Sequence, residues 1–443
     1  MNAIEVFQDW LDDYLNFEQL PQKDIFWLDT IDYLCKRFDN PQDYAPCVHI
    51  AGSKGKGSVS KMIACILEEA GYNVGLYSSP HISDFRERIC KPSGFFDEKI
   101  YEDTIKEMVP NIESILTLPA ERAITWFELV TLYAFLCFKN AKVDWSVFEV
   151  GLGGRLDATN IIRPKLCCIT PIELEHTEFL GDTLEKIAAE KAGIIKNCTP
   201  VIIAQQQKNS VKRVFSEKAF TRHAPCYFVE DLIKNASYSF DEKKKRMNVH
   251  FESEIFNRPI DTQMRMLGKT QIQNATMAAI AVRKLLPNLD ESIIEKGLSK
   301  AQLPGRFEII EKPNNYKEIP DLILDGAHTC KSINATIDTM NKIFGEKKIN
   351  LLFACAADKD IKDIALLFKY RFNKIFVTRP GDKKQSDIKA EIEAFKNAGL
   401  NFSADADYKA MIIKAFEESA AEGSILLVTG SFYLVSEVVA FIG

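Results

Sequence analysis

The hydrophobic positions in the first 45 residues recur at helical spacing. This spacing predicts two helices, whose apolar stripes are Phe7, Trp10, Leu11 and Tyr14 in the first and Ile31, Leu34 and Phe38 in the second. Asn40-Pro41 and Ala45-Pro46 interrupt the pattern. We therefore expect turns between this helical region and the segment that follows.

From residue 48, strand and helix patterns alternate. An apolar strand at residues 48–51 leads through a glycine-rich turn to a helix at 58–70, which Gly71 ends, and then to a strand at 73–77. Such a strand-helix-strand unit implies a parallel sheet. Further apolar runs predict buried strands at residues 143–150, 166–170 and 201–204.

A second alternating series begins after residues 303–306. Strand-like runs occur at residues 322–324, 351–354, 375–378 and 425–429, with helical patterns between them. About 140 residues of this alternation are enough for a separate domain. We therefore predict an α/β protein with a larger domain at residues 1–300 and a smaller, Rossmann-like α/β domain at 301–443.

Composition narrows the class of protein. The 443 residues are 46% hydrophobic and 27% charged, and 56 Lys and Arg against 62 Asp and Glu give a net charge of −6. This is an ordinary globular composition, so a broad cationic surface for nucleic acid is not expected. Residues 243–246 form a basic run between β-like stretches, which we interpret as the solvated tip of a hairpin.

The cysteines and the apolar runs indicate the compartment. Eleven scattered cysteines, mostly within apolar runs and without a CxxC pair, favour buried free thiols in a reducing compartment. The N-terminus is acidic where a signal peptide would be basic. The longest apolar stretch, residues 129–138, is about half of a membrane span. We expect a soluble, cytoplasmic protein with no membrane partner.

Residues 49–58 (HIAGSKGKGS) carry the strongest chemical signal. Glycines between a strand and a helix expose backbone N–H groups to phosphates, the helix N-terminus adds its dipole, and Lys56 adds a point charge. The strict GxxxxGK[ST] spacing fails, since Gly52 lies too close to Gly55 and Gly57 follows Lys56. A plain glycine turn is the alternative, but Lys56 and the strand-turn-helix context favour a P-loop mononucleotide-binding domain.

Glu149 ends an apolar strand and begins the segment EVGLGGRLDATN. A buried acid is costly unless it is paired or binds a metal, and Mg²⁺ beside nucleotide phosphates would supply the charge. The alternative is an acid exposed at the end of the strand.

Lys191 shares the apolar face of a helix predicted after residue 182, at the spacing of Leu184, Ile187 and Ala188. Burial would lower the pKa of its amine and make it nucleophilic. From spacing alone, snorkelling to solvent is the favoured interpretation. Lys186 and Glu190 are expected to pair on the outer face at i, i+4, and His176 by itself is more often structural than a ligand.

Asp325 and His328 follow a predicted strand of the second domain, and polar segments follow two of its other strands. The carboxyl ends of parallel strands share one rim, where a second substrate or the far side of a nucleotide would bind. Chance placement in a loop is the alternative.

These segments, in this order, resemble folylpolyglutamate synthase and dihydrofolate synthase of the Mur ligase superfamily, from about residue 30 to the C-terminus. The phosphate loop is similar to the family's G-T-N-G-K-G-[ST] variant. Residues 77–89 (YSSPHISDFRERI) resemble the loop that distinguishes the folate enzymes from the cell-wall ligases. Further matches are residues 125–128, 149–160, 190–194, 303–307, 325–328 and 430–433.

The resemblance implies a set of site residues. The ATP-binding positions are Gly52, Ser53, Lys54, Gly55, Lys56, Gly57, Ser58, Asn274, Arg306, Asp325 and His328. The ligands of two expected Mg²⁺ ions include Ser79, Glu149 and His176. The folate-binding positions are Ser79, Pro80, His81, Phe85 and Arg88. Lys191 matches a lysine that CO₂ carbamylates, which requires a neutral amine and reverses the preference for snorkelling. Lys56, Glu149, His176 and Lys191 are the expected catalytic residues.

The implied reaction is ATP-dependent ligation of L-glutamate to dihydropteroate or a reduced folate through an acyl phosphate. A folylpolyglutamate synthase without the second activity, another Mur-type ligase, and a nucleotide-binding regulator without ligation are the alternatives. A monomer is expected. The chain departs from the family pattern at Ser53-Lys54 (Thr-Asn), Glu175 (Asp) and Thr329-Cys330 (Asn-Pro).

Overall fold

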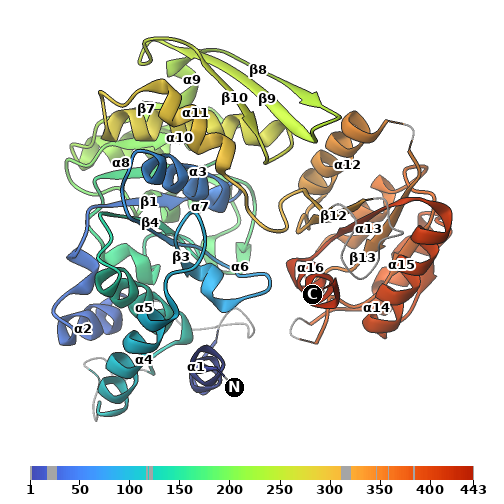
Figure 1. Cartoon of the computed structure of the whole chain (residues 1–443), viewed down its shortest axis with the longest axis horizontal. Helices are drawn as coiled ribbons and strands as arrows, with labels where there is room; N and C mark the ends of the chain where they lie inside the picture. Colours follow the sequence, from blue (N-terminus) through green and yellow to red (C-terminus); the bar gives the residue numbers. More distant parts are fainter. Residues whose placement is uncertain are drawn as a thin grey trace. The chain divides into compact units, whose positions relative to one another are not determined.

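The computed structural model describes residues 2–16, 27–115, 118, 123–310, 321–345, 347–357, 359–382 and 385–442. The chain forms two compact units, whose elements are labelled in Figure 1. The first unit comprises Met1–Ser237, Val249–Gln263 and Thr270–Ala301, and the second comprises Tyr238–Asn248, Met264–Lys269 and Gln302–Gly443. The second unit therefore takes two short segments that precede residue 300.

The first unit contains a seven-stranded sheet in the order β3-β2-β4-β1-β5-β6-β7. Its strands are β1 (Cys47–Ala51), β2 (Val74–Tyr77), β3 (Ile89–Cys90), β4 (Trp145–Glu149), β5 (Leu166–Ile169), β6 (Val201–Ile203) and β7 (Cys226–Phe228). All neighbours are parallel except β3, which pairs antiparallel with β2. The expected parallel sheet is confirmed, with β4 between β1 and β2.

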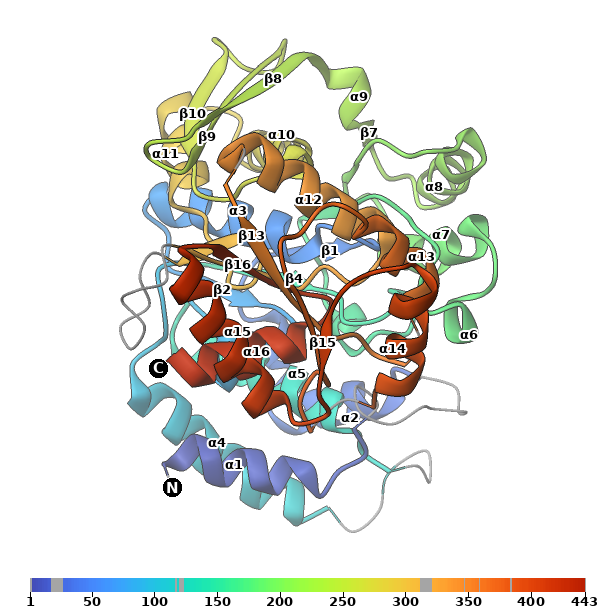
Figure 2. The same cartoon turned by 90° about the vertical axis from the view of Figure 1, so that its right-hand side faces the viewer.

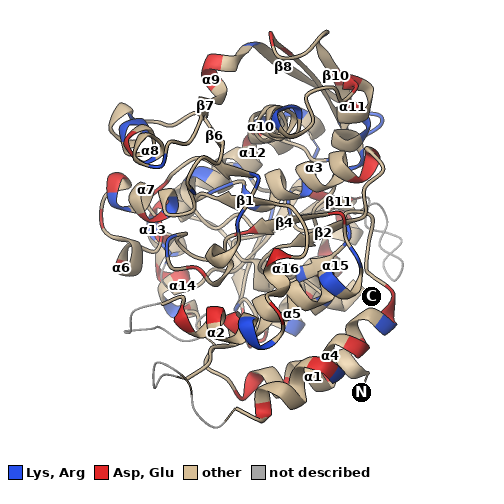
Figure 3. Cartoon of the chain, turned by 90° about the vertical axis from the view of Figure 1, so that its left-hand side faces the viewer, with Lys and Arg blue, Asp and Glu red and all other residues tan. Residues whose placement is uncertain are grey.

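Helices surround this sheet: α1 (Ala3–Asp12), α2 (Asp29–Arg37), α3 (Lys56–Glu69), α4 (Glu98–Glu113), α5 (Trp126–Asn140), α6 (Thr177–Leu180), α7 (Leu184–Ala192), α8 (Asn209–Thr221), α9 (Val229–Leu232), α10 (Lys269–Leu285) and α11 (Glu291–Lys300). Short 3₁₀ turns are η1 (Pro41–Asp43), η2 (Phe85–Arg88) and η3 (Ala158–Ile161). Both N-terminal helices lie where the spacing predicts them. Along α4, basic and acidic residues are interspersed (Figure 3), and Lys106 pairs with Glu102 one turn away.

Helix α5 supplies many residues of an apolar cluster in the first unit and is buried over nearly its whole length. The apolar stretch at 129–138 is therefore core, and no helix among the described residues has the length and hydropathy to cross a membrane. All eleven cysteines are free and eight of them are buried, as expected from their apolar surroundings.

A three-stranded sheet has the order β10-β9-β8, with β8 (Ile233–Asp241), β9 (Arg246–Ser253) and β10 (Ile260–Met264). The basic run 243–246 lies at the turn between β8 and β9, so the predicted hairpin is confirmed. The prediction that the tip of this hairpin is solvated is only partly confirmed. Lys243 and Lys244 are exposed, but Lys245 forms an ion pair with the buried Asp321.

The second unit contains a six-stranded sheet in the order β11-β12-β16-β13-β14-β15. Its strands are β11 (Glu308–Ile310), β12 (Leu322–Asp325), β13 (Ile349–Phe353), β14 (Ile375–Val377), β15 (Ser403–Ala404) and β16 (Ile425–Thr429). Only β11 is antiparallel to its neighbour. Figure 2 shows helices on both sides of these strands: α12 (Cys330–Phe344), α13 (Ile361–Leu367), α14 (Ile388–Asn397), α15 (Tyr408–Glu422) and α16 (Phe432–Ile442).

Candidate active site

The phosphate loop joins β1 to α3 in the predicted strand-turn-helix arrangement. Gly52 has φ +140° and Gly55 has φ +92°, a region that favours glycine. A Cβ on Gly52 would lie 1.8 Å from Thr170 Oγ1, and one on Gly55 would lie 2.6 Å from Asn274 Oδ1. Glycine is therefore required at both positions, and Asn274 of α10 lies directly against the loop.

Two lysines converge on the first residue of this loop. Lys56 Nζ donates to the Gly52 carbonyl at 3.1 Å, and Lys191 Nζ donates to the same oxygen at 2.9 Å. Lys191 also forms an ion pair with Glu175 at 3.0 Å, and its side chain is only 2% exposed. The snorkelling interpretation of Lys191 is therefore wrong.

This arrangement lowers the pKa of both members of the ion pair, Lys191 and Glu175. Burial and the nearby Lys56 cation lower the pKa of Lys191 to about 8, against the opposing pull of Glu175. Burial alone would raise the pKa of Glu175, but Lys56, Lys191 and Lys54 outweigh it and lower that pKa below its ordinary value. Lys191 therefore has a neutral fraction near pH 8 that an exposed lysine lacks.

Helix α7 holds Lys191 in place through contacts that the helical spacing did not predict. The expected pair of Lys186 and Glu190 is wrong: Lys186 pairs with Asp182 at 2.9 Å, and Glu190 pairs with Arg155 at 3.0 Å. Arg155 belongs to the glycine-rich segment after β4, and its N–H also donates to the Glu190 carbonyl at 2.8 Å. The end of α7 is thus fastened to that segment.

Glu149 lies at the end of β4 and is 4% exposed, so an exposed strand-end acid is excluded. Its Oε2 accepts a hydrogen bond from the Ser79 N–H at 3.4 Å. A carboxylate and a serine hydroxyl, the oxygen groups of Glu149 and Ser79, are the kind of hard ligand that Mg²⁺ prefers. His176 is exposed and precedes α6 with φ +46°. The described residues include no group of three or more His, Cys, Asp or Glu side chains suited to a metal.

A buried hydrogen-bonded chain connects β1 to the segment after β4. The Asp157 carboxylate accepts from the Leu152 N–H at 3.0 Å and from the Thr159 hydroxyl at 2.5 Å, and Thr159 Oγ1 lies 2.8 Å from His49 Nε2. Because the Thr159 hydroxyl has one proton and donates it to Asp157, this network assigns a proton to His49 Nε2. Burial lowers the pKa of His49 to about 3, so its ring is neutral.

The sequence analysis did not predict these hydrogen bonds among Asp157, Thr159 and His49. All three residues lie within motifs quoted above, and the one sequence feature that pointed to a buried polar contact was a histidine in the middle of an apolar strand. Pairing across 110 residues cannot be read from one sequence.

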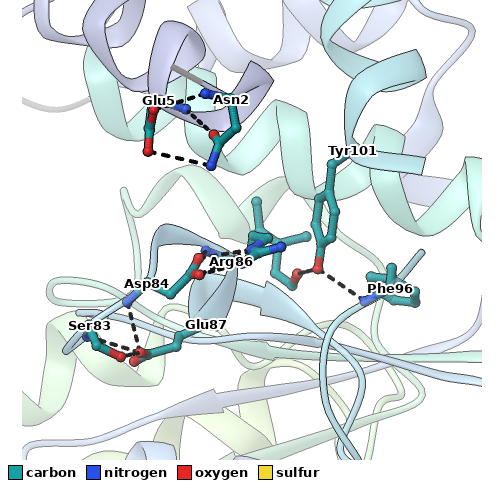
Figure 4. A network of polar contacts seen from close by, with 9 residues as sticks. Asn2, Glu5, Ser83, Asp84, Arg86, Glu87, Phe96 and Tyr101 are labelled. Atoms are coloured by element: carbon teal, nitrogen blue, oxygen red, sulfur yellow. Dashed lines mark hydrogen bonds and ion pairs between the residues drawn. The ribbon is translucent and has the colours of Figure 1, made fainter. Parts of the chain in front are cut away.

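The loop at residues 78–90 is organised by its own acidic side chains (Figure 4). Glu87 accepts hydrogen bonds from the backbone N–H groups of Ser83 and Asp84, both at 2.9 Å. It also accepts one from the Ile82 N–H at 2.8 Å. Asp84 caps η2 and pairs with Arg86 at 2.6 Å. These contacts within the loop stabilise its backbone conformation.

The expected folate-binding residues divide into two groups. Phe85 and Arg88 are each 2% exposed; Arg88 lies 4.8 Å above the Trp126 ring and donates to His81 Nδ1 at 2.7 Å. Ser79, Pro80 and His81 are at least partly accessible. Three of the five expected residues are therefore accessible, and the other two are buried within the fold.

In the second unit, Arg306 and His328 lie near the Phe432 ring, and the charge of Arg306 acts on Asp325. The Arg306 guanidinium lies 4.3 Å from the Phe432 ring centre, and the His328 ring lies 6.2 Å from it. Burial raises the pKa of Asp325, although the Thr336 hydroxyl and Arg306 oppose this. These residues lie at the carboxyl end of β12, as expected.

Thr329, where the family pattern has Asn, is the N-cap of α12. Its hydroxyl accepts from the Ser332 N–H at 3.3 Å. Since Thr and Asn are both effective caps, this departure preserves the start of the helix.

Two families of Mur ligase domains match the sequence. The Mur ligase middle domain family matches residues 50–282, and the Mur ligase glutamate ligase domain family matches residues 305–432. The dihydrofolate synthase/folylpolyglutamate synthase of Bacillus subtilis (strain 168) is 30% identical over 442 residues, which cover 98% of both chains. The chain belongs to the dihydrofolate synthase/folylpolyglutamate synthase family of Mur ligases. It is therefore a member of a family of ATP-dependent ligases.

Solved structures of this family agree with the fold. The folylpolyglutamate synthase of Thermotoga maritima has a TM-score of 0.82 and 29% identity, covering 99% of this chain and 96% of that one. Escherichia coli FolC in complex with DHPP and ADP has a TM-score of 0.81 and 25% identity, covering 100% and 98%. The expected family, α/β fold class and ligase activity are confirmed.

Proposed function

We propose that this ligase adds L-glutamate both to dihydropteroate and to reduced folates, with ATP and Mg²⁺. The observation that carries the proposal is the convergence of Lys56 and Lys191 on the carbonyl of Gly52, at the start of a phosphate loop. The Bacillus subtilis relative carries both synthase activities in its name, and the E. coli structure contains DHPP and ADP.

ATP phosphates would bind the loop formed by Gly52, Ser53, Lys54, Gly55, Lys56, Gly57 and Ser58. Backbone N–H groups at the start of α3 and the Lys56 ammonium face anions favourably there. Asn274 of the first unit, which lies against Gly55, and Arg306, Asp325 and His328 of the second would contact the nucleotide. We assign residues 1–300 to ATP binding and 301–443 to glutamate ligation, which the two family matches support.

In the first step, a carboxylate oxygen of the acceptor attacks the γ-phosphorus of ATP, the bond to the ADP oxygen breaks, and an acyl phosphate forms. Lys56 and Lys54 hold the phosphate oxygens and offset their charge. In the second step, the glutamate amine attacks the acyl carbon, and phosphate leaves as the nitrogen loses a proton.

Ser79, Glu149 and His176 would hold Mg²⁺, and two ions are expected in all. The buried carboxylate of Glu149 beside Ser79 fits such an ion. When bound, Mg²⁺ neutralises phosphate charge during transfer. The hydrogen bonds among Asp157, Thr159 and His49 keep the segment after β4 in position.

Lys191 would be carbamylated. Its neutral amine attacks the carbon of CO₂, a C–N bond forms and a proton leaves, so an ammonium becomes a carboxylate-like group. The pKa of about 8 supports this reaction, because only the neutral amine is nucleophilic.

The accessible residues Ser79, Pro80 and His81 would contact the pterin-bearing acceptor, with Phe85 and Arg88 shaping the loop beneath them. We further propose that the enzyme is a cytoplasmic monomer that binds neither nucleic acid nor membrane. Sedimentation of the purified protein tests the monomer.

The deciding experiment measures phosphate release with ATP, Mg²⁺ and glutamate, using dihydropteroate and tetrahydrofolate in parallel. We expect both acceptors to support release and Lys56→Ala to abolish it. Activity with tetrahydrofolate alone would restrict the enzyme to folylpolyglutamate synthesis. Release that ignores the pterin acceptor would refute the proposal, and acceptance of a nucleotide-sugar peptide instead would indicate a cell-wall-type ligase.

A further inference from the structure

A pocket of about 310 Å³ in the second unit is lined by five basic side chains. They come from three separate stretches of the chain: Lys244, Lys245 and Arg246 at the β8–β9 turn, Arg265 just after β10, and Arg306 just before β11. The sequence interpretation of the basic run as a solvated tip therefore misses a concave surface. Its volume is at the lower end of the range for small-ligand sites, about 300–1,000 Å³.

Two of the five cations have acidic neighbours. Lys245 pairs with Asp321, and the charge of Arg306 acts on Asp325. Glu308 also lines the pocket, but its Oε2 accepts a hydrogen bond from the Gly305 N–H at 2.9 Å. Of these three acids, only Glu308 lines the pocket.

Lys244, Arg246 and Arg265 differ from Lys245 and Arg306, which have acidic neighbours. Arg246 donates to the Lys245 carbonyl at 3.4 Å and Arg265 donates to the Gln302 side-chain oxygen at 3.3 Å, both neutral acceptors. Within the parts of the chain that the structure describes, none of the three pairs with a carboxylate.

Several of the residues that line this pocket are apolar. Met266, Leu267 and Phe307 are buried, and Arg246 opens strand β9. Like charges in a concavity with low-dielectric walls concentrate a positive potential. Guanidinium groups bind phosphate and carboxylate through two parallel N–H donors, and an ammonium adds a point charge.

We propose that this pocket is a binding site for a multiply charged oxyanion. The shared chemistry is that of phosphate and of polycarboxylates. Arg306 also lines the pocket and is one of the proposed nucleotide contacts, so the proposal rests on Lys244, Arg246 and Arg265, to which the proposed ligase reaction assigns no role. Lys244, Arg246 and Arg265 supply the charge, and the bound anion relieves their mutual repulsion.

The test is calorimetric titration of the full chain with inorganic phosphate and, separately, with citrate as a tricarboxylate. Because the phosphate loop also attracts anions, each titration is repeated in Lys56→Ala. A site in the pocket remains in that variant. The test variant is Lys244→Ala/Arg246→Gln, and the matched control is Lys243→Ala/Lys269→Ala, two exposed lysines that do not line the pocket.

We expect the test variant to weaken binding by about tenfold or more and the control to leave it nearly unchanged, since charge-assisted bonds are lost only in the former. Binding of phosphate alone assigns a phosphate site; binding of citrate as well assigns a general polyanion site. Equal weakening in both double variants, loss of all binding in Lys56→Ala, or no saturable binding would overturn the proposal. If the double variant does not fold, Arg265→Gln provides the same comparison.

Discussion

At the scale of single residues, Lys191 combines burial, an adjacent cation and an acidic partner. Alanine at this position is expected to lower turnover by about 100-fold or more, comparable to loss of a main charge-stabilising group. Short carboxylates such as acetate should restore part of it by replacing the carbamate. Nucleotide binding, measured separately, should remain. Full turnover in the variant would show that the lysine is only structural.

The lowered pKa of Lys191 predicts that activation by bicarbonate depends on pH. Its folded pKa of about 8 is below the ordinary 10.5, so the neutral amine becomes available as pH rises through 8. Activation by limiting bicarbonate should therefore increase between about pH 7 and 9. The contribution of Lys191 to the free energy of unfolding also rises with pH. Above pH 8 the folded state binds fewer protons than the unfolded state, so stability increases with pH there. Incorporation of ¹³C-bicarbonate checks the first expectation.

Thr159 gives a prediction about stability. Thr159→Val keeps the shape of the side chain but removes the hydroxyl between Asp157 and His49, leaving buried polar groups without that partner. We expect a loss of about 1–3 kcal/mol of unfolding free energy. Thr159→Ser keeps the hydroxyl and should lose less, and urea unfolding of the two variants decides. Equal losses would mean that the methyl group matters more than the hydrogen bonds.

At the scale of elements, the phosphate loop depends on a close approach between β1 and β5. Gly52→Ala would place a methyl group within 1.8 Å of Thr170 Oγ1, and so should abolish nucleotide binding. Gly71→Ala is the matched control, because Gly71 also has positive φ but no atom lies within 4 Å of the added carbon. It should cost only about 1 kcal/mol in backbone strain. Intact nucleotide affinity in Gly52→Ala would contradict this view of the loop.

Elements with strong periodicity could be predicted from the sequence, and others could not. The apolar runs at residues 48–51, 166–170 and 425–429 coincide with strands, since buried parallel strands are continuously apolar. The two-residue strands β3 and β15 have no such signal, because their pairing is decided by neighbouring strands. Likewise, motifs predicted that Lys56 lies at the glycine loop and that Glu149 ends a buried strand, whereas the partners of Lys186 and Glu190 depend on tertiary packing.

At the scale of the whole molecule, the second unit depends on segments that lie earlier in the chain. Lys245 reaches the buried Asp321, so Lys245→Met would leave that carboxylate without its cation. We expect a loss of about 1–3 kcal/mol in unfolding free energy. Lys243→Met, two residues away and exposed, should have little effect. Thermal unfolding of the two variants makes the comparison, and equal midpoints would mean that the ion pair contributes nothing.

A fragment of residues 302–443 lacks Tyr238–Asn248 and Met264–Lys269. These segments contain the buried side chains of Met247, Met264, Met266 and Leu267. The fragment should therefore be less stable than the same unit in the full chain.

This discontinuity also sets the order of events during synthesis. The ribosome delivers residues 238–248 and 264–269 well before the strands against which they will pack. At ordinary elongation rates, their apolar side chains wait on the order of ten seconds for the remaining residues of the unit. The nascent chain therefore passes through a stage in which the first unit is complete while two short segments of the second unit are not yet covered by their packing partners.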